Sequence, residues 1–101
     1  MGYLLNVSFM VDASISGQWI NFMNDKFLPF VKTQSILDRI TFSKVLSATV
    51  EDSYIFSLLV EFNTLDGYKL FQTEIMEQYV QIAQPLFDSK TTHFMSLMKR
   101  M

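Results

Sequence analysis

The nine-residue run from Tyr54 to Phe62 is the feature that most constrains the fold of this chain. Successive side chains of a strand point to opposite faces of a sheet, so the run divides into two alternating sets. One set is wholly apolar and the other is half apolar: Tyr54, Phe56, Leu58, Val60 and Phe62 against Ile55, Ser57, Leu59 and Glu61. This pattern predicts a central strand with one face in the core and a second face that is also covered.

The run from Tyr3 to Val11 has the same design. Its two sets are Tyr3, Leu5, Val7, Phe9 and Val11 against Leu4, Asn6, Ser8 and Met10. Because both strands need cover on both faces, we expect helices of the same chain on one face. We expect a second copy of the protein on the other.

Two further segments carry apolar residues at intervals of three and four, as on one face of an amphipathic helix. Asp12 and Thr64 precede these segments and have side chains that cap a helix N-terminus. Because proline lacks a backbone N–H, Pro29 and Pro85 predict an end or kink of the first helix and the end of the second. The two stripes are Ile15, Trp19, Phe22, Met23 and Phe27, and then Leu65, Tyr68, Phe71, Ile75, Tyr79, Ile82 and Leu86.

Two more strands complete the chain, over residues 39–48 and 91–99, with a hairpin loop over 49–53. The alternation of the first of these is blurred around Ser43 and Lys44, which indicates a bulge or an edge position. The last strand does not show which of its sides faces the core. The order βαββαβ predicts an α+β, ferredoxin-like fold. We expect a four-stranded antiparallel sheet with both helices on one face, the first and third strands central, and dimerisation through the open sheet face.

Length and composition narrow the possible functions. With 101 residues the chain is expected to form a single domain over residues 1–101. Half of the residues are hydrophobic and 18% are charged, against about 25% charged in a typical domain. The excess of apolar residues predicts self-association or a ligand cavity. The net charge of −2 without a basic stripe argues against nucleic-acid binding.

The sequence also excludes several kinds of chemistry and location. It has no cysteine, so disulfides and thiolate sites are excluded. No apolar run reaches the roughly 18 residues of a membrane span, and the N-terminus lacks the pattern of a signal peptide. We therefore expect a cytoplasmic protein without membrane partners. His93 is the only imidazole and the carboxylates are scattered, so neither a metal site nor a cofactor is predicted.

The mixed face of the two central strands is the candidate site. One hypothesis makes its polar residues the anchors of a largely apolar ligand pocket. The other, which we favour, makes the face a dimer interface, and the two are compatible because a dimer can enclose a cavity. The candidate residues are Asn6, Ser8, Met10, Ile55, Ser57, Leu59 and Glu61. We assign no catalytic residue, because His93 alone near a strand start is more typical of a surface or half-buried position.

With this element order in place, the chain resembles the dimeric α/β barrel superfamily, which includes the antibiotic-biosynthesis-monooxygenase-like proteins. Within it, the chain is most similar to a bacterial family of short proteins without an assigned function. The similarity is carried by the runs Tyr3–Val11 and Tyr54–Phe62, by Trp19-Ile-Asn-Phe-Met with Leu28-Pro29, and by His93-Phe-Met-Ser-Leu-Met. The resemblance implies a homodimer joined through its open sheet faces. It also implies, as in many members, a small apolar molecule between sheet and helices.

The chain departs from the superfamily pattern at positions tied to chemistry. Related chains often have histidines where this one has Phe27 and Ile75. Haem-degrading relatives combine a first-strand Asn, a Trp and a helix His. Here Asn6 is present, Trp19 falls on the first helix rather than the second, and the helix His is missing. These departures argue against haem chemistry.

The leading hypothesis is therefore a homodimeric binding protein, for a small apolar ligand or a protein partner. The alternative is a cofactor-independent enzyme of monooxygenase or isomerase type with a pocket between sheet and helices. Asn6, Ser8 and Glu61 would be the polar groups of that pocket.

Overall fold

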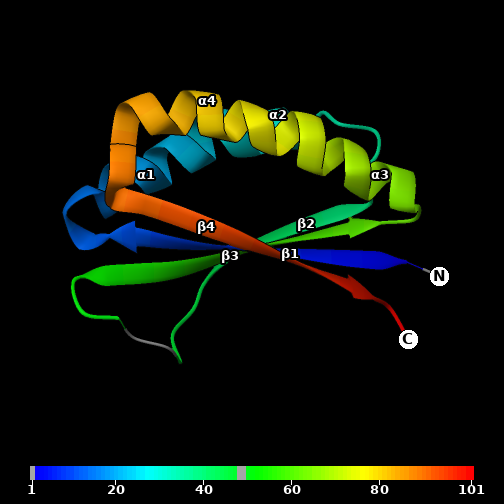
Figure 1. Cartoon of the computed structure of the whole chain (residues 1–101), viewed down its shortest axis with the longest axis horizontal. Helices are drawn as coiled ribbons and strands as arrows, with labels where there is room; N and C mark the ends of the chain where they lie inside the picture. Colours follow the sequence, from blue (N-terminus) through cyan, green and yellow to red (C-terminus); the bar gives the residue numbers. More distant parts are fainter. Residues whose placement is uncertain (1, 48–49) are drawn as a thin grey trace.

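The computed structural model describes residues 2–47 and 50–101 and contains a four-stranded antiparallel sheet with helices on one face (Figure 1). The strands are β1 (Tyr3–Asp12), β2 (Arg39–Lys44), β3 (Ser53–Phe62) and β4 (Thr91–Lys99), in the spatial order β2-β3-β1-β4. The first and third strands are central, as predicted, and the α+β ferredoxin-like topology is confirmed. In Figure 1 the opposite face of the sheet has no helix or strand over it.

The helical layer consists of two continuous stretches, residues 13–32 and 65–90. The first contains η1 (Ala13–Ile15), α1 (Ser16–Phe22), η2 (Met23–Phe27) and α2 (Leu28–Lys32). The second contains α3 (Leu65–Leu70), η3 (Phe71–Ile75), α4 (Met76–Phe87) and η4 (Asp88–Lys90). Both predicted caps are present: Asp12 accepts from the backbone N–H of Ser14 at 2.8 Å, and Thr64 accepts from that of Gly67 at 3.2 Å.

Neither proline ends its helical stretch, although an end was predicted at Pro85 and an end or a kink at Pro29. The first stretch continues beyond Pro29 to Lys32, and the second beyond Pro85 to Phe87. Pro29 lies just after the π-helical turn η2, and the carbonyl four residues before it belongs to the exposed Asp25. Pro85 lies in the last turn of α4, and the carbonyl that it leaves without a donor belongs to the exposed Gln81. Each proline therefore sits where a helix tolerates it.

The predicted second apolar stripe was wrong at its first residue, Leu65, which is 40% exposed, and at its last two residues. Ile82 and Leu86 are 44% and 61% exposed, whereas their neighbours Ala83 and Phe87 are buried. The cause is η3, a π-helical turn that accommodates one more residue than an α-helical turn. Side chains beyond this turn are rotated relative to the α-helical count. The buried face therefore moves by one residue.

The core lies between the sheet and the helices. Phe9 of β1 is at its centre, with ring centroids 5.2 Å from both Trp19 of α1 and Tyr79 of α4. The indole Nε1–H of Trp19 donates a hydrogen bond of 3.0 Å to the hydroxyl of Tyr79. This buried bond joins the two helical stretches, and it places Trp19 in the core as predicted.

Strand β2 is shorter than predicted. It ends at Lys44, although the N–H of Val45 still bonds the carbonyl of Ile55 at 2.8 Å. Its pairing with β3 is continuous, so the blurred alternation reflects an edge position and not a bulge. Residues 48 and 49, which end the predicted strand and begin the predicted loop, lie outside the described residues.

Two glycines in comparable helical positions should respond oppositely to alanine. A Cβ on Gly17 meets nothing within 4 Å, whereas one on Gly67 would lie 3.1 Å from the Phe62 ring and 3.2 Å from the carbonyl oxygen of Ile36. We expect Gly17→Ala to raise the free energy of unfolding by about 0.5–1 kcal/mol through helix propensity. Gly67→Ala should lower it by about 1–3 kcal/mol through overpacking. Urea denaturation checks both values, and equal stabilisation by the two would contradict the tight packing at Gly67.

Candidate functional site

The candidate residues predicted from the sequence lie together on the open sheet face. The register of the two central strands sets Asn6 opposite Leu59, Ser8 opposite Ser57, and Met10 opposite Ile55. Opposed residues of paired strands share a face, and the neighbours of these residues in the sequence are the buried residues of the core. The face that carries the candidate residues is therefore the one without helices.

Three of these polar side chains bond to one another. The Ser57 hydroxyl donates to Oδ1 of Asn6, and Nδ2 of Asn6 donates to the Ser8 hydroxyl oxygen at 3.1 Å. We call Asn6, Ser8 and Ser57 the polar cluster. Because its members satisfy much of their own hydrogen bonding, the cluster can be covered by another surface at a lower cost than isolated polar groups.

Large apolar side chains border the polar cluster. Met10 and Met98 are about 40% exposed, and Phe94 is 65% exposed. The register sets Phe94 opposite Ser8 and Met98 opposite Leu4, so both β4 residues belong to the open face. Phe94 and Met98 were not predicted, because the alternation within β4 does not show which side of the strand faces the core.

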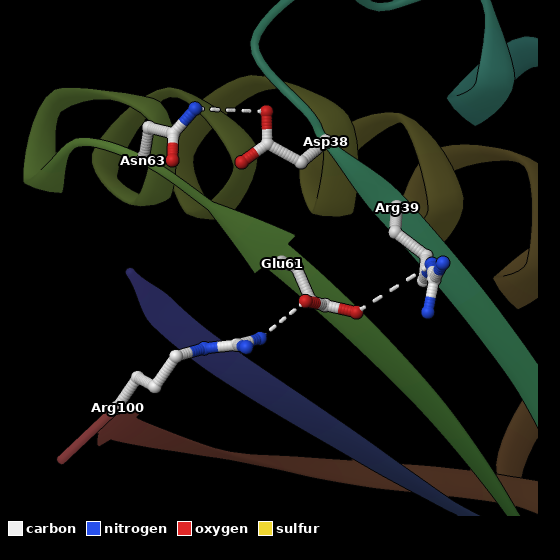
Figure 2. A network of polar contacts seen from close by, with 5 residues as sticks. All are labelled: Asp38, Arg39, Glu61, Asn63 and Arg100. Atoms are coloured by element: carbon white, nitrogen blue, oxygen red, sulfur yellow. Dashed lines mark hydrogen bonds and ion pairs between the residues drawn. The ribbon is translucent and has the colours of Figure 1, made fainter. Parts of the chain in front are cut away.

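Glu61 ends the open face at one corner of the sheet, where Figure 2 shows it between two arginines. One carboxylate oxygen is paired with Arg100, and the other lies 4.0 Å from Nε of Arg39. Beside this group, Nδ2 of Asn63 donates to Asp38 at 3.0 Å. A shallow hollow of about 310 Å³ adjoins these residues. The negative charge of Glu61 is largely neutralised by Arg39 and Arg100. We therefore interpret Glu61 as an ion-pair partner at the rim of the open face.

A second hollow lies at the edge of the helical layer, between α4 and the beginning of β4. We call it the α4–β4 pocket. Its volume is about 280 Å³. Its lining consists of Tyr79, Val80, Ala83, Gln84, Asp88, Ser89, Thr91 and His93. The lining residues come from α4, η4 and β4, and the sequence pattern does not show how these elements pack, so this pocket was not predicted.

The tyrosine in the pocket wall is tied to the core. Besides accepting from Trp19, the Tyr79 hydroxyl lies 3.4 Å from that of Thr91. Burial raises the pKa of Tyr79 above its ordinary value, although both hydrogen bonds oppose this rise. The phenol is therefore neutral at physiological pH and its hydroxyl is already occupied.

The histidine in the pocket wall has no such partner. His93 is half-buried, and its ring stands edge-on to that of Tyr79 with the centroids 5.6 Å apart. No hydrogen bond from a described residue reaches its imidazole. Burial lowers the pKa of His93 below its ordinary value of 6.5, because removing water penalises the charged ring. His93 therefore presents a neutral imidazole, which can both donate and accept a hydrogen bond.

The predicted polar residues and the pocket between sheet and helices lie on different faces of the sheet. Asn6, Ser8 and Glu61 lie on the face opposite the helices, so they do not line a pocket between sheet and helices. His93, to which no role was assigned, does line one. Within residues 2–47 and 50–101, no group of three or more His, Asp or Glu side chains is arranged to hold a metal ion. In the same residues, no helix is long and apolar enough to cross a membrane.

Comparison with known proteins relates nearly the whole chain to one family. Residues 2–101 match the family model described as a domain of unknown function, DUF4286. No curated protein matches the sequence.

Solved structures share the fold at low sequence identity. A dimeric ferredoxin-like protein from an uncultured marine organism has a TM-score of 0.76 and 8% identity, over 96% of this chain and 92% of that one. A dimeric ferredoxin-like protein of unknown function from Thermobifida fusca has a TM-score of 0.64 and 10% identity, with the same coverage of 96% and 92%. A DABB family protein with a ferredoxin-like fold from Mesorhizobium loti has a TM-score of 0.67 and 14% identity, over 99% and 100%.

The half-buried histidine should make stability depend on pH. The pKa of His93 is lower in the folded chain than its ordinary value of 6.5, so the unfolded chain takes up the proton first as the pH falls. The contribution of the neutral His93 ring to the free energy of unfolding is therefore fully present above pH 6.5, and it is lost as the pH falls below this value. We expect the urea midpoint to be lower at pH 5.5 than at pH 7.5. His93→Gln should reduce this difference, and an unchanged difference in the variant would contradict the assignment.

Proposed function

The chain belongs to the DUF4286 family of unknown function, and we propose that it is a homodimeric protein that binds a small, mostly apolar molecule in the α4–β4 pocket. The observation that carries the proposal is the pocket itself, with a partly apolar lining and an imidazole that bonds to no group of the described residues. The proposal keeps the expectations from the sequence: a bacterial, cytoplasmic protein that uses neither cofactor nor metal and binds neither nucleic acid nor membrane.

The composition of the pocket supports binding. The pocket is a surface cleft of about 280 Å³ that borders the core through the buried residues Tyr79 and Ala83, and a small molecule could occupy it. Val80, Ala83 and Tyr79 are apolar or aromatic members of its lining, and Thr91 and His93 are polar members. A largely apolar cleft with a few convergent polar groups is typical of small-molecule sites.

The open sheet face supports the homodimer. Phe94, Met10 and Met98 expose apolar surface around the polar cluster, and no helix or strand of the described residues covers this face. Exposed apolar patches of this kind mark interfaces. Two of the structures that share the fold are described as dimeric. We propose that a second copy of the chain covers the open face. If a different protein covers it instead, the purified chain will be a monomer.

The alternative is a cofactor-independent enzyme of the kind implied by the resemblance to antibiotic-biosynthesis-monooxygenase-like proteins. The observation in its favour is His93, a neutral imidazole at the wall of the pocket that can accept a proton. The polar groups first assigned to this chemistry lie on the other face of the sheet. Binding is therefore the better-supported function.

Charge placed in the middle of the open face should break the homodimer. Leu59 pairs with Asn6 and with Thr41 of β2, so it lies inside the proposed interface. Burying an unpaired ammonium there would cost several kcal/mol. We expect Leu59→Lys to be a folded monomer by circular dichroism and light scattering, and Phe94→Ser to dimerise at least about tenfold more weakly.

The matched control is Gln78→Lys, which adds the same charge to an exposed position of α4. It should remain dimeric. A dimeric Leu59→Lys, or a wild type that is monomeric at tens of micromolar, would refute the interface.

We expect the proposed ligand to remain bound when the untagged protein is purified from its own host. Native mass spectrometry is expected to show a species near twice 11.8 kDa with an added small molecule. Val80→Phe fills the pocket and should remove the added mass. Leu70→Phe, a comparable exchange at an exposed site of α3, should keep it. A dimer that never carries added mass would count against small-molecule binding and favour a protein partner.

A further inference from the structure

We propose that the α4–β4 pocket selects an uncharged molecule of one or two rings that shares a hydrogen bond with His93, and rejects the anionic counterpart of the same molecule. This inference rests on the proposed function and names the class of ligand. It is carried by the size of the pocket, by the kinds of charge on its walls and by the polar groups that the fold leaves unpaired.

The size of the pocket limits its occupant to one or two rings. Small-molecule sites range from roughly 300 to 1,000 Å³, and this pocket of about 280 Å³ lies just below the lower limit. Its apolar lining residues are Val80, which is partly exposed, and Ala83 and Tyr79, which are buried. The ring of His93 stands edge-on to Tyr79 at 87° and is half-buried, so it is the aromatic surface that a flat ring can contact.

The charges on the walls disfavour an anion. The ionisable lining residues are Asp88, Tyr79 and His93, and no lysine or arginine is among the lining residues. Lys90 lies between the lining residues Ser89 and Thr91 but is not itself one of them. A bound carboxylate would therefore meet an acidic residue, Asp88, and no cationic residue among those that line the pocket. An uncharged ligand avoids both costs.

The unpaired polar groups indicate where the ligand would bond. The Tyr79 hydroxyl is held by Trp19 and lies within reach of Thr91. Among the described residues, by contrast, the imidazole of His93 bonds to no other side chain or backbone group. Its neutral ring offers one donor and one acceptor, so a hydroxyl or carbonyl on the ligand can pair with it.

The test compares two probes with the same fused ring, uncharged 2-naphthol and anionic 2-naphthoate, at pH 7. Amide chemical shifts are followed by ¹H–¹⁵N NMR during titration of the full-length chain. We expect saturable shifts at Val80, Ala83, Thr91 and His93, with 2-naphthol binding at least about tenfold more tightly than 2-naphthoate. His93→Ala should weaken 2-naphthol about five- to tenfold through the lost hydrogen bond. Thr92→Ala, at the neighbouring β4 position on the open face, should not.

Each outcome decides the inference. Equal binding, or tighter binding of 2-naphthoate, with shifts in the pocket refutes the selection of uncharged ligands while leaving the pocket as a binding site. Unchanged 2-naphthol affinity in His93→Ala refutes the role of His93. If neither probe gives saturable shifts in the pocket, the inference fails, and the native mass spectrometry described above judges the proposed function separately. An anionic ligand found there would refute the inference and uphold the function.

Discussion

The buried hydrogen bond between the Trp19 indole and the Tyr79 hydroxyl connects the main parts of this structure. It links the first helical stretch to the second, and Phe9 of the central strand packs against both rings. A buried polar group without a partner is costly, so each residue stabilises the position of the other. Tyr79 in turn forms a wall of the α4–β4 pocket beside Thr91. The helix arrangement and the candidate ligand site therefore depend on the same contact.

The sheet is the second organising element, because its two faces have different roles. One face is buried under both helical stretches, and the other carries the polar cluster with an apolar surround. Placing both helices on one side follows from the βαββαβ order with right-handed connections. The same topology leaves the opposite face bare, and its apolar side chains then require a partner surface to be removed from water. Assembly through this face and ligand binding at α4 would use separate parts of the molecule.

In the helical layer, local side chains determine the N-terminal caps, whereas the π-helical turns determine which side chains are buried. The caps at Asp12 and Thr64 follow from side chains near the backbone groups that they bond, so they were predictable. The π-helical turns η2 and η3 were not, because no local signal marks them. They determine which residues of the following turns reach the core, and for that reason Phe87 is buried while Leu86 is exposed.

The sequence alone determined the element order, the two central strands and the residues that these two strands place on the open face. Alternation at period two records which side chains need burial, and it does so whatever partner covers them. Only the tertiary structure decided which side of β4 faces the core, since both of its alternating sets mix polar and apolar residues. It also decided that His93 meets Tyr79 at a pocket. This contact depends on how helix α4 packs against the edge strand β4. The residue pattern of one segment does not show where it touches the other.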